Sequence, residues 1–150
     1  NSSRALVMIF TGTNCPYFDL YFERIKGLQK SYSSDGIRMV LVDSNTKPFG
    51  ESSLETYQRT TAENIPYELL YLSDSSKTVQ KTLNVKVVPE VVVLVPDEGV
   101  FSKAYQGPID NSPQSAASAD KKYVEEILEK ILIKRPYRVN HKHPIGCRIR

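Results

Sequence analysis

Two cysteines are the residues of this sequence with the most distinctive chemistry, Cys15 near the start and Cys147 near the end. Cys15 directly precedes Pro16, and proline favours the first position of a helix, where its missing N–H group is not needed. We therefore expect Cys15 at a helix N-cap, where free backbone N–H groups and the positive end of the helix dipole converge. Both features stabilise a thiolate, so the sequence predicts a nucleophilic thiol at Cys15.

Each cysteine has an alternative interpretation. Cys15 could instead be a buried, inert cysteine, and Asp19, four residues later, places a carboxylate that opposes thiolate formation on the same helix face. Cys147 is either a resolving thiol that condenses with an oxidised Cys15, or a free or packed thiol in the tail. A disulfide requires the two Cα atoms to approach within about 7 Å. We expect the tail that carries Cys147 to pack near the first helix.

Metal and cofactor sites have weak support. His141, His143 and Cys147 offer imidazole and thiolate groups, which suit copper or zinc. Because this ligand set is incomplete, we expect no metal site, and a copper-handling protein remains an alternative. The sequence contains no G-x-G-x-x-G or Walker pattern, and we expect no dissociable cofactor.

The elements that position the cysteines follow from the hydrophobic pattern. Residues 5–10 are a continuous apolar run, typical of a strand buried on both faces, and residues 16–33 have apolar side chains at helical spacing. Strands and helices alternate, which predicts a mainly parallel sheet with helices on both faces and an antiparallel hairpin at one edge. We expect Asp74 or Ser75 to cap a short helix that ends at Leu83, and Asp120 to cap the last helix. The predicted strands cover 5–10, 37–43, 67–72, 90–95 and 100–107, and the other helices cover 53–64 and 120–134.

The length of 150 residues fits one α/β domain, expected over 1–135, followed by a basic tail at 136–150. From Lys134 onward the chain holds six of its 20 Lys and Arg residues and none of its 17 Asp and Glu residues. A basic tail suits nucleic acid or anionic lipid, but aromatic residues are not interleaved with these basic ones as a nucleic-acid surface needs. We therefore expect the tail to pack on the acidic body, with no nucleic-acid partner.

The sequence predicts no membrane-spanning segment, because no apolar run approaches the roughly 18 residues that a span needs. The chain begins at Asn1 and enters a hydrophobic strand almost at once, which favours a trimmed N-terminus. Membrane association is expected only through a segment that precedes Asn1.

Three motifs carry a resemblance to a known family. They are VMIFTGTNCPYF at 7–18, VVPEVVVLV at 87–95, and PIGC at 144–147. Together they resemble the peroxiredoxin-like branch of the redoxins, which is related to alkyl hydroperoxide reductases and to thiol-disulfide reductases of the bacterial envelope. The resemblance implies a thioredoxin-like fold, with a central mixed sheet flanked by helices and a redoxin-type helix–strand insertion at about 52–72.

The resemblance also implies an activity, a thiol-dependent oxidoreductase that is either a disulfide reductase or peroxidase-like. Cys15 is then the nucleophile and Cys147 the resolving thiol, and the partner is a thioredoxin-type electron donor or a protein disulfide substrate. Pro89 falls in a cis-proline loop, where Val88 presents backbone groups to a substrate strand. The binding residues implied beside the nucleophile are Thr11, Thr13, Asn14 and Pro16.

Two positions depart from the related families. Phe18 stands where a C-x-x-C motif has its second cysteine, so Cys15 cannot form the usual short-range disulfide. Gly12 stands where peroxiredoxins have a threonine, three residues before the cysteine, which leaves the hydroxyl of Thr11 or Thr13 as a substitute. These departures keep a non-catalytic thioredoxin-fold binding module as the alternative function.

Two further expectations accompany the resemblance. Glu90 directly follows the proline of the expected cis-proline loop, and we expect its carboxylate to face solvent rather than to shuttle protons. Related proteins often reside in the bacterial envelope, which favours a periplasmic or secreted location over the cytoplasm.

Overall fold

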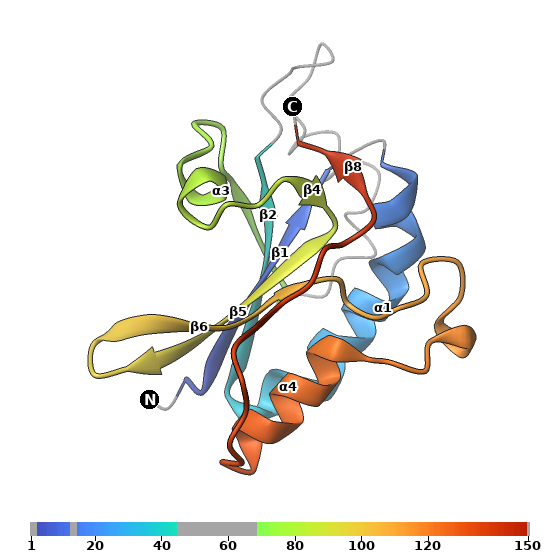
Figure 1. The fold of residues 1–150 in the computed structure, drawn as a ribbon. Helices are drawn as coiled ribbons and strands as arrows, with labels where there is room; N and C mark the ends of the chain where they lie inside the picture. Colours follow the sequence, from blue (N-terminus) through green and yellow to red (C-terminus); the bar gives the residue numbers. More distant parts are fainter. Residues whose placement is uncertain (1–2, 13–14, 45–68, 150) are drawn as a thin grey trace.

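The apolar runs of the sequence assemble into one six-stranded sheet in the computed structural model, which describes residues 3–12, 15–44 and 69–149. The strand order is β3-β2-β1-β5-β6-β7, and β4 and β8 form a separate two-stranded sheet (Figure 1). The central mixed sheet flanked by helices that the resemblance implies is confirmed. The strands are β1 (Ala5–Thr11), β2 (Ile37–Asp43), β3 (Leu70–Ser73), β4 (Val87–Val88), β5 (Glu90–Asp97), β6 (Val100–Gly107), β7 (Asn140–His141) and β8 (Cys147–Arg148).

The centre of the sheet consists of β1 and β5, because their side chains are apolar on both faces. Val7, Ile9 and Phe10 of β1 are fully buried, as are residues 91–93 of β5. β1 pairs in parallel with β2, and Ala5 lies opposite Ile37. Strands covered on both faces are near-continuous apolar runs, as these sequences are. The end of β1 is therefore held rigidly, and the loop to Cys15 begins there.

The two long helices lie beside each other on one face of the sheet, and the short helix α3 lies on the other side (Figure 1). The first long helix turns Phe18, Tyr21 and Ile25 into the core. The hydroxyl of Tyr32 donates to a carboxylate oxygen of Glu129 at 2.6 Å and joins the two helices. The helices are α1 (Pro16–Tyr32), α3 (Thr78–Thr82) and α4 (Tyr123–Leu132), with short 3-10 turns η1 (Ser33–Asp35) and η2 (Ala116–Ser118).

Antiparallel pairing is not confined to the edge of the sheet, which corrects the prediction. β5 lies antiparallel to the central strand β1, with Ile9 opposite Val91, and antiparallel to β6. The physical reason is the connection between β3 and β5. Its helix α3 has five residues, which span about 7.5 Å at 1.5 Å per residue. A helix this short does not return along the length of the strands, so β5 starts at the end of the sheet where β3 ends and runs in the opposite direction.

The N-caps of α3 and α4 in the structure differ from the two caps that the sequence predicts. Asp74 accepts the backbone N–H groups of Val79 at 3.1 Å and Gln80 at 2.9 Å, so it satisfies the first turn of α3 although Lys77 holds the N-cap position. Asp120 does not cap the last helix, because its carboxylate accepts a hydrogen bond from the side chain of Asn111. That helix begins at Tyr123.

The predicted insertion at about 52–72 is only partly visible. Its helix, expected over 53–64, lies outside the described residues. Its strand appears as β3, which pairs in parallel with β2.

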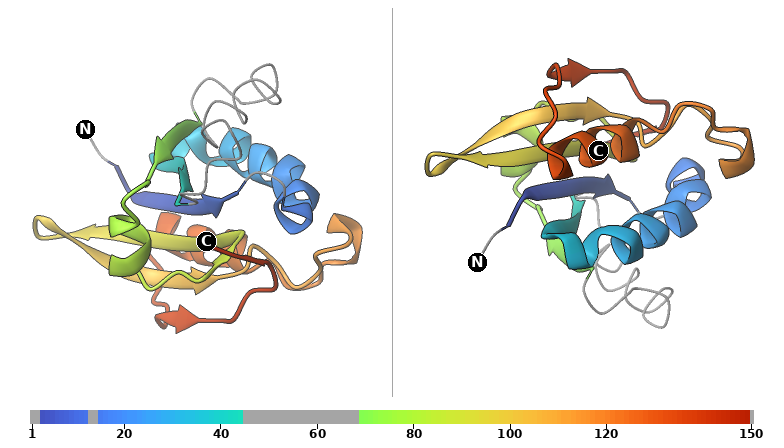
Figure 2. Two further views of the ribbon diagram at one scale, coloured as in Figure 1. Left: turned by 90° about the horizontal axis from the view of Figure 1, so that it is seen from above. Right: turned by 90° about the horizontal axis from the view of Figure 1, so that it is seen from below.

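The β5–β6 hairpin extends beyond the rest of the sheet (Figure 2), and Val100 and Phe101 at its tip are exposed.

The C-terminal tail, which has no strand pattern in its sequence, forms the two short strands β7 and β8. β7 extends the main sheet in parallel with β6, and the N–H of Lys142 donates to the carbonyl oxygen of Gln106 at 2.8 Å. β8 pairs with β4. The tail thus packs on the body at two places, and both use backbone hydrogen bonds, which are independent of side-chain type.

Candidate active site

Cys15 occupies the N-cap of α1, as its position before Pro16 predicts. Its backbone is extended, with φ −106° and ψ 111°, and Pro16 takes the first helical position. Its carbonyl oxygen accepts the N–H of Asp19 at 3.1 Å and starts the helical hydrogen-bond series. The sulfur therefore lies at the positive end of a helix of 17 residues, which stabilises a thiolate when the cysteine is reduced.

Cys15 and Cys147 form a disulfide across a separation of 132 residues, with their Cα atoms 6.0 Å apart. Only 2% of Cys15 is exposed, whereas Cys147 is half-buried. Cys147 is thus next to the start of the first helix, where we expect the tail to pack. Cys15 is thus buried, as the alternative interpretation also expects, and it is bonded to Cys147.

The tail reaches Cys15 by pairing with the strand before Pro89. Val88 of β4 lies opposite Cys147 of β8, and Val87 lies opposite Arg148. The N–H of Ile149 donates to the carbonyl oxygen of Lys86 at 3.0 Å and extends the pairing by one residue. The tail cysteine is therefore delivered to Cys15 as part of a short antiparallel strand.

The Val88–Pro89 peptide bond is cis, as the resemblance implies. The carbonyl oxygen of Val88 lies 3.6 Å from Sγ of Cys15. Val88 and Pro89 are thus brought to Cys15 from a different part of the chain.

The remaining predicted binding residues are less fully described. Thr11 is completely buried at the end of β1, and its hydroxyl has no hydrogen-bond partner among the described atoms. Thr13 and Asn14 lie outside the described residues. Phe18, at the position of a second C-x-x-C cysteine, is buried and packs against Phe22 with ring centroids 5.8 Å apart. Asp19 is exposed, although partial burial raises the pKa of its carboxyl group.

Glu90 is buried, with 3% exposure, which corrects the expectation that it faces solvent. Its carboxylate accepts a hydrogen bond from the amide nitrogen of Gln106 at 3.0 Å. Nε2 of His141 in β7 lies 3.8 Å from the same carboxylate. The physical reason is the neighbouring strand β6, whose fully buried Gln106 supplies the donor that a buried carboxylate needs.

A cavity of about 210 Å³ lies beside the docked tail. Ile145 and His143 of the tail line one side of this cavity, and Pro89 and Tyr21 line another. The loop at 108–113 completes it. This loop is held by Asp110, which accepts hydrogen bonds from both Tyr21 and Arg24. The tail therefore forms part of the wall of this cavity.

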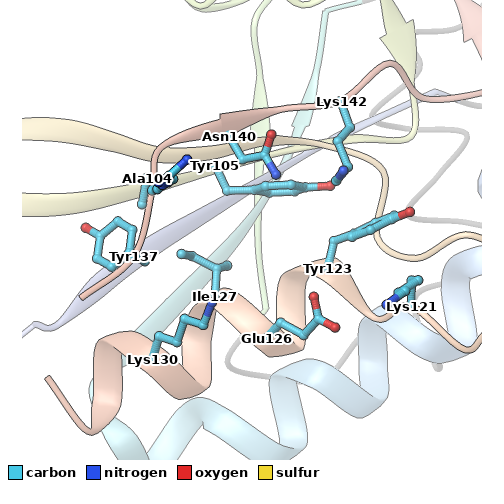
Figure 3. A pocket seen from close by; sticks show the side chains of 11 residues that line it. Ala104, Tyr105, Lys121, Tyr123, Glu126, Ile127, Lys130, Tyr137, Asn140 and Lys142 are labelled. Atoms are coloured by element: carbon cyan, nitrogen blue, oxygen red, sulfur yellow. The ribbon is translucent and has the colours of Figure 1, made fainter. Parts of the chain in front are cut away.

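A second cavity, of about 310 Å³, lies between α4, β6 and the tail (Figure 3). Tyr105 and Tyr123 stack in it, with ring centroids 6.4 Å apart, and Nζ of Lys142 lies 4.8 Å from the centroid of the Tyr123 ring. Burial, followed by the nearby Tyr123 and Glu90, raises the pKa of Tyr105 above its usual range. Neither cysteine lines this cavity, and its aromatic contacts hold the tail upstream of Cys147.

The metal alternative has no support in this state of the protein. Cys147 is bonded to Cys15, so its thiolate is not available to a metal. The rings of His141 and His143 lie 5.5 Å apart. Across residues 3–12, 15–44 and 69–149, no group of three or more His, Cys, Asp or Glu residues could hold a metal ion.

In the same ranges, no helix is long and apolar enough to cross a membrane.

Sequence reasoning did not identify Gly146 as part of the site. A Cβ atom at this position would collide with the carbonyl oxygen of Val88 and would lie 2.8 Å from its carbonyl carbon. The only local signal is a glycine directly before the tail cysteine. Its role depends on which strand the tail meets, and that is a property of the tertiary structure.

The fold and the cysteine at the start of α1 define a thioredoxin-fold protein. A family model described as Thioredoxin-like matches residues 3–100, and the chain belongs to this family. No curated protein matches the sequence.

Solved structures with the same fold are similar along most of their length. An uncharacterized conserved protein from Geobacillus kaustophilus has 24% identity and a TM-score of 0.85, covering 99% of this chain and 78% of its own. A protein assigned as thiol:disulfide interchange protein DsbE from Chlorobium tepidum has 17% identity and a TM-score of 0.63, with 87% and 81% covered. A secreted disulfide oxidoreductase from Mycobacterium tuberculosis has 13% identity and a TM-score of 0.53, with 89% and 83% covered. At these identities the likeness shows the fold.

Proposed function

We propose that this chain is a thiol-disulfide oxidoreductase in which Cys15 is the nucleophile and Cys147 is the resolving thiol. The observation that carries the proposal is the Cys15–Cys147 disulfide, with one sulfur at the N-cap of α1 and the other on a strand docked beside Pro89. A second cysteine 132 residues away replaces the second cysteine of a C-x-x-C motif, whose position Phe18 fills.

The proposed reaction begins with both cysteines reduced. The Cys15 thiolate attacks one sulfur of a substrate disulfide, and the electron pair of the broken S–S bond leaves with the other sulfur as a thiolate. The Cys147 thiolate then attacks Sγ of Cys15, closes the intramolecular disulfide and releases the second substrate thiolate. Two electrons pass from the chain to the substrate, and a thioredoxin-type dithiol donor returns them by the same exchange chemistry.

The proposed partners are protein disulfides outside the cytoplasm. Disulfides form and persist in oxidising compartments, and a disulfide links the two ends of this chain. The structural neighbours described as a thiol:disulfide interchange protein and as a secreted disulfide oxidoreductase support this proposal. We accordingly propose a periplasmic or secreted location.

Two single substitutions test the proposal. The reduced chain is mixed with oxidised insulin or with hydrogen peroxide, and the products are followed by thiol counting and intact mass. We expect the unaltered chain to reduce insulin and to gain the Cys15–Cys147 disulfide. Cys147→Ser is expected to accumulate a mixed disulfide at Cys15, and Cys15→Ser is expected to be inactive.

Other outcomes lead to the alternatives. Insulin reduction that survives in Cys15→Ser would overturn the assignment of the nucleophile. A reduced chain that turns over neither oxidant would leave the non-catalytic binding module. Peroxide consumption much faster than insulin reduction would identify a peroxidase, in which Cys15 becomes a sulfenic acid and Cys147 condenses with it to release water.

A further inference from the structure

The tail shows how an extended segment with a cysteine fits the edge of β4. β8 pairs antiparallel with β4 and places Cys147 opposite Val88, and the N–H of Ile149 adds a hydrogen bond to Lys86. These contacts use the backbone of β4, so they accept any extended chain with free backbone groups. Selectivity must therefore come from the side chains around the cysteine.

The residue before the cysteine is restricted to glycine in this register. A Cβ atom at Gly146 would collide with the carbonyl oxygen of Val88, and its distance to the amide nitrogen of Pro89 would be 3.4 Å. Both neighbours are backbone atoms of the strand that also contacts Cys15, so neither moves aside as a flexible side chain does. Any segment that pairs in the same register meets the same obstacle.

Two apolar residues flank the cysteine in the tail, Ile145 two residues before it and Ile149 two residues after it. Ile149 packs against the hydrophobic core, and Ile145 lines the cavity beside Pro89 while 60% exposed. Arg148, directly after the cysteine, is exposed. The edge of β4 thus offers apolar surface at two positions and none at the position directly after the cysteine.

We infer that the edge of β4 selects partner proteins by an extended segment of the pattern apolar–Gly–Cys–any–apolar. The tail, with the sequence IGCRI at 145–149, occupies this edge when the chain is oxidised. Reduction of the disulfide releases the edge, and a partner segment of the same pattern takes its place with its cysteine opposite Val88. This inference rests on the proposed function, since it names the substrate of the same site.

Peptides with an activated cysteine test the selectivity. One peptide has the sequence of residues 143–149, and a matched peptide has alanine at the position of Gly146. Each carries its cysteine as a mixed disulfide with thionitrobenzoate. Full-length Cys147→Ser, whose single thiol is Cys15, attacks the peptide sulfur. The bond between the peptide and thionitrobenzoate breaks, the peptide becomes bonded to Cys15, and the coloured thionitrobenzoate anion leaves with the electron pair.

We expect Cys147→Ser to react about tenfold or more faster with the glycine peptide than with the alanine peptide, a difference of about 1.4 kcal/mol in the barrier. Glutathione reacts with both peptides as a reference for their intrinsic reactivity. The tail of the variant competes equally with both peptides, so it does not change the ratio. A third peptide, with serine at the position of Ile149, is expected to react more slowly than the glycine peptide.

Two outcomes would overturn the inference, and they differ in what they mean for the proposed function. Equal rates with the two peptides, as for glutathione, would show that the edge of β4 has no preference for glycine, while the reactivity of Cys15 stands. Failure of Cys147→Ser to react with the peptides and with the symmetrical disulfide of thionitrobenzoate would show that Cys15 is not a nucleophile, and the proposed function would fall as well.

Discussion

The Sγ atom of Cys15 lies 3.6 Å from the carbonyl oxygen of Val88, the residue whose peptide bond to Pro89 is cis. Val88 is also the residue opposite Cys147 in the β4–β8 pair. One backbone segment therefore contacts both members of the disulfide. The tail is held to this segment by few hydrogen bonds, so changes in the tail are expected to alter the disulfide.

Gly146→Ala is expected to weaken the Cys15–Cys147 disulfide, because the added Cβ atom meets the carbonyl group of Val88. In a glutathione redox buffer, the equilibrium constant for forming the disulfide should fall about tenfold or more. Mass spectrometry of alkylated thiols measures the oxidised fraction at each buffer composition.

Gly27→Ala is the matched control for that experiment. Gly27 lies inside α1, and a Cβ atom there would have no neighbour within 4 Å. Alanine is expected to raise the free energy of unfolding by about 0.5–1 kcal/mol, because glycine is unfavourable in a helix interior. The redox equilibrium should not change. A normal disulfide equilibrium in Gly146→Ala would contradict the close approach to Val88.

Reduction of the disulfide is expected to release β8 but not β7. The N–H of Ile149, bonded to Lys86, depends on the docking of β8, whereas the N–H of Lys142 is bonded to Gln106 of the main sheet. Hydrogen exchange of the reduced chain, followed by NMR, should show protection of Ile149 lower by about tenfold or more and protection of Lys142 almost unchanged. Equal loss at both amides would mean that the tail detaches as one unit.

Asp110→Ala is expected to lower the free energy of unfolding by about 3 kcal/mol, because it leaves the partly buried guanidinium of Arg24 without its carboxylate. Asp110 is 5% exposed and lies 2.8 Å from Arg24. Urea unfolding measures the change. Glu23→Ala is the control, since Glu23 forms its ion pair with Lys26 on the surface with 81% of its side chain exposed. Its effect should stay below about 0.5 kcal/mol. Equal losses of unfolding free energy in Asp110→Ala and Glu23→Ala would contradict the argument that burial makes the Asp110–Arg24 pair the more important one.

Tyr32 is expected to make the protein less stable at high pH. Burial, followed by the hydrogen bond to Glu129, raises the pKa of Tyr32 above its ordinary value of 10.0. The unfolded chain loses this proton near pH 10, while the folded chain keeps it. The stabilisation is therefore complete below pH 10 and is lost as the pH rises toward the pKa of the folded state.

Tyr32→Phe should remove this dependence. Between about pH 10 and 11, the free energy of unfolding should fall less steeply in Tyr32→Phe, by up to about 1.4 kcal/mol per pH unit. Urea unfolding at a series of pH values gives both slopes. An unchanged slope would show that the phenol of Tyr32 ionises equally easily in the folded chain.

Several elements were predictable because their signals are local. The run at 5–10 is apolar at every position, and Pro16 marks the start of a helix, so β1 and the N-cap position of Cys15 follow from neighbouring residues. The resemblance also implied the cis bond before Pro89. These predictions needed no information on which distant segments meet.

Two predictions about carboxylate side chains were wrong, because residues outside the local sequence pattern decide where these side chains lie. Glu90 is polar, which favours solvent exposure, but β6 places the buried Gln106 beside it. Asp120 has the residue type of a cap, but Asn111, nine residues earlier in the connection between β6 and α4, donates its side-chain amide to the Asp120 carboxylate. In both cases a hydrogen bond to a residue outside the local pattern decided where the carboxylate lies.

By itself, the sequence determined that one cysteine lies at a helix start in an α/β fold, because helix capping and hydrophobic periodicity act between residues close in the chain. Only the tertiary structure decided that Cys147 is its partner, by pairing β8 with β4 in a register that Gly146 permits. The physical reason is that strand pairing uses backbone groups that every residue except proline carries in full, so a sequence of single letters does not specify which two edges meet.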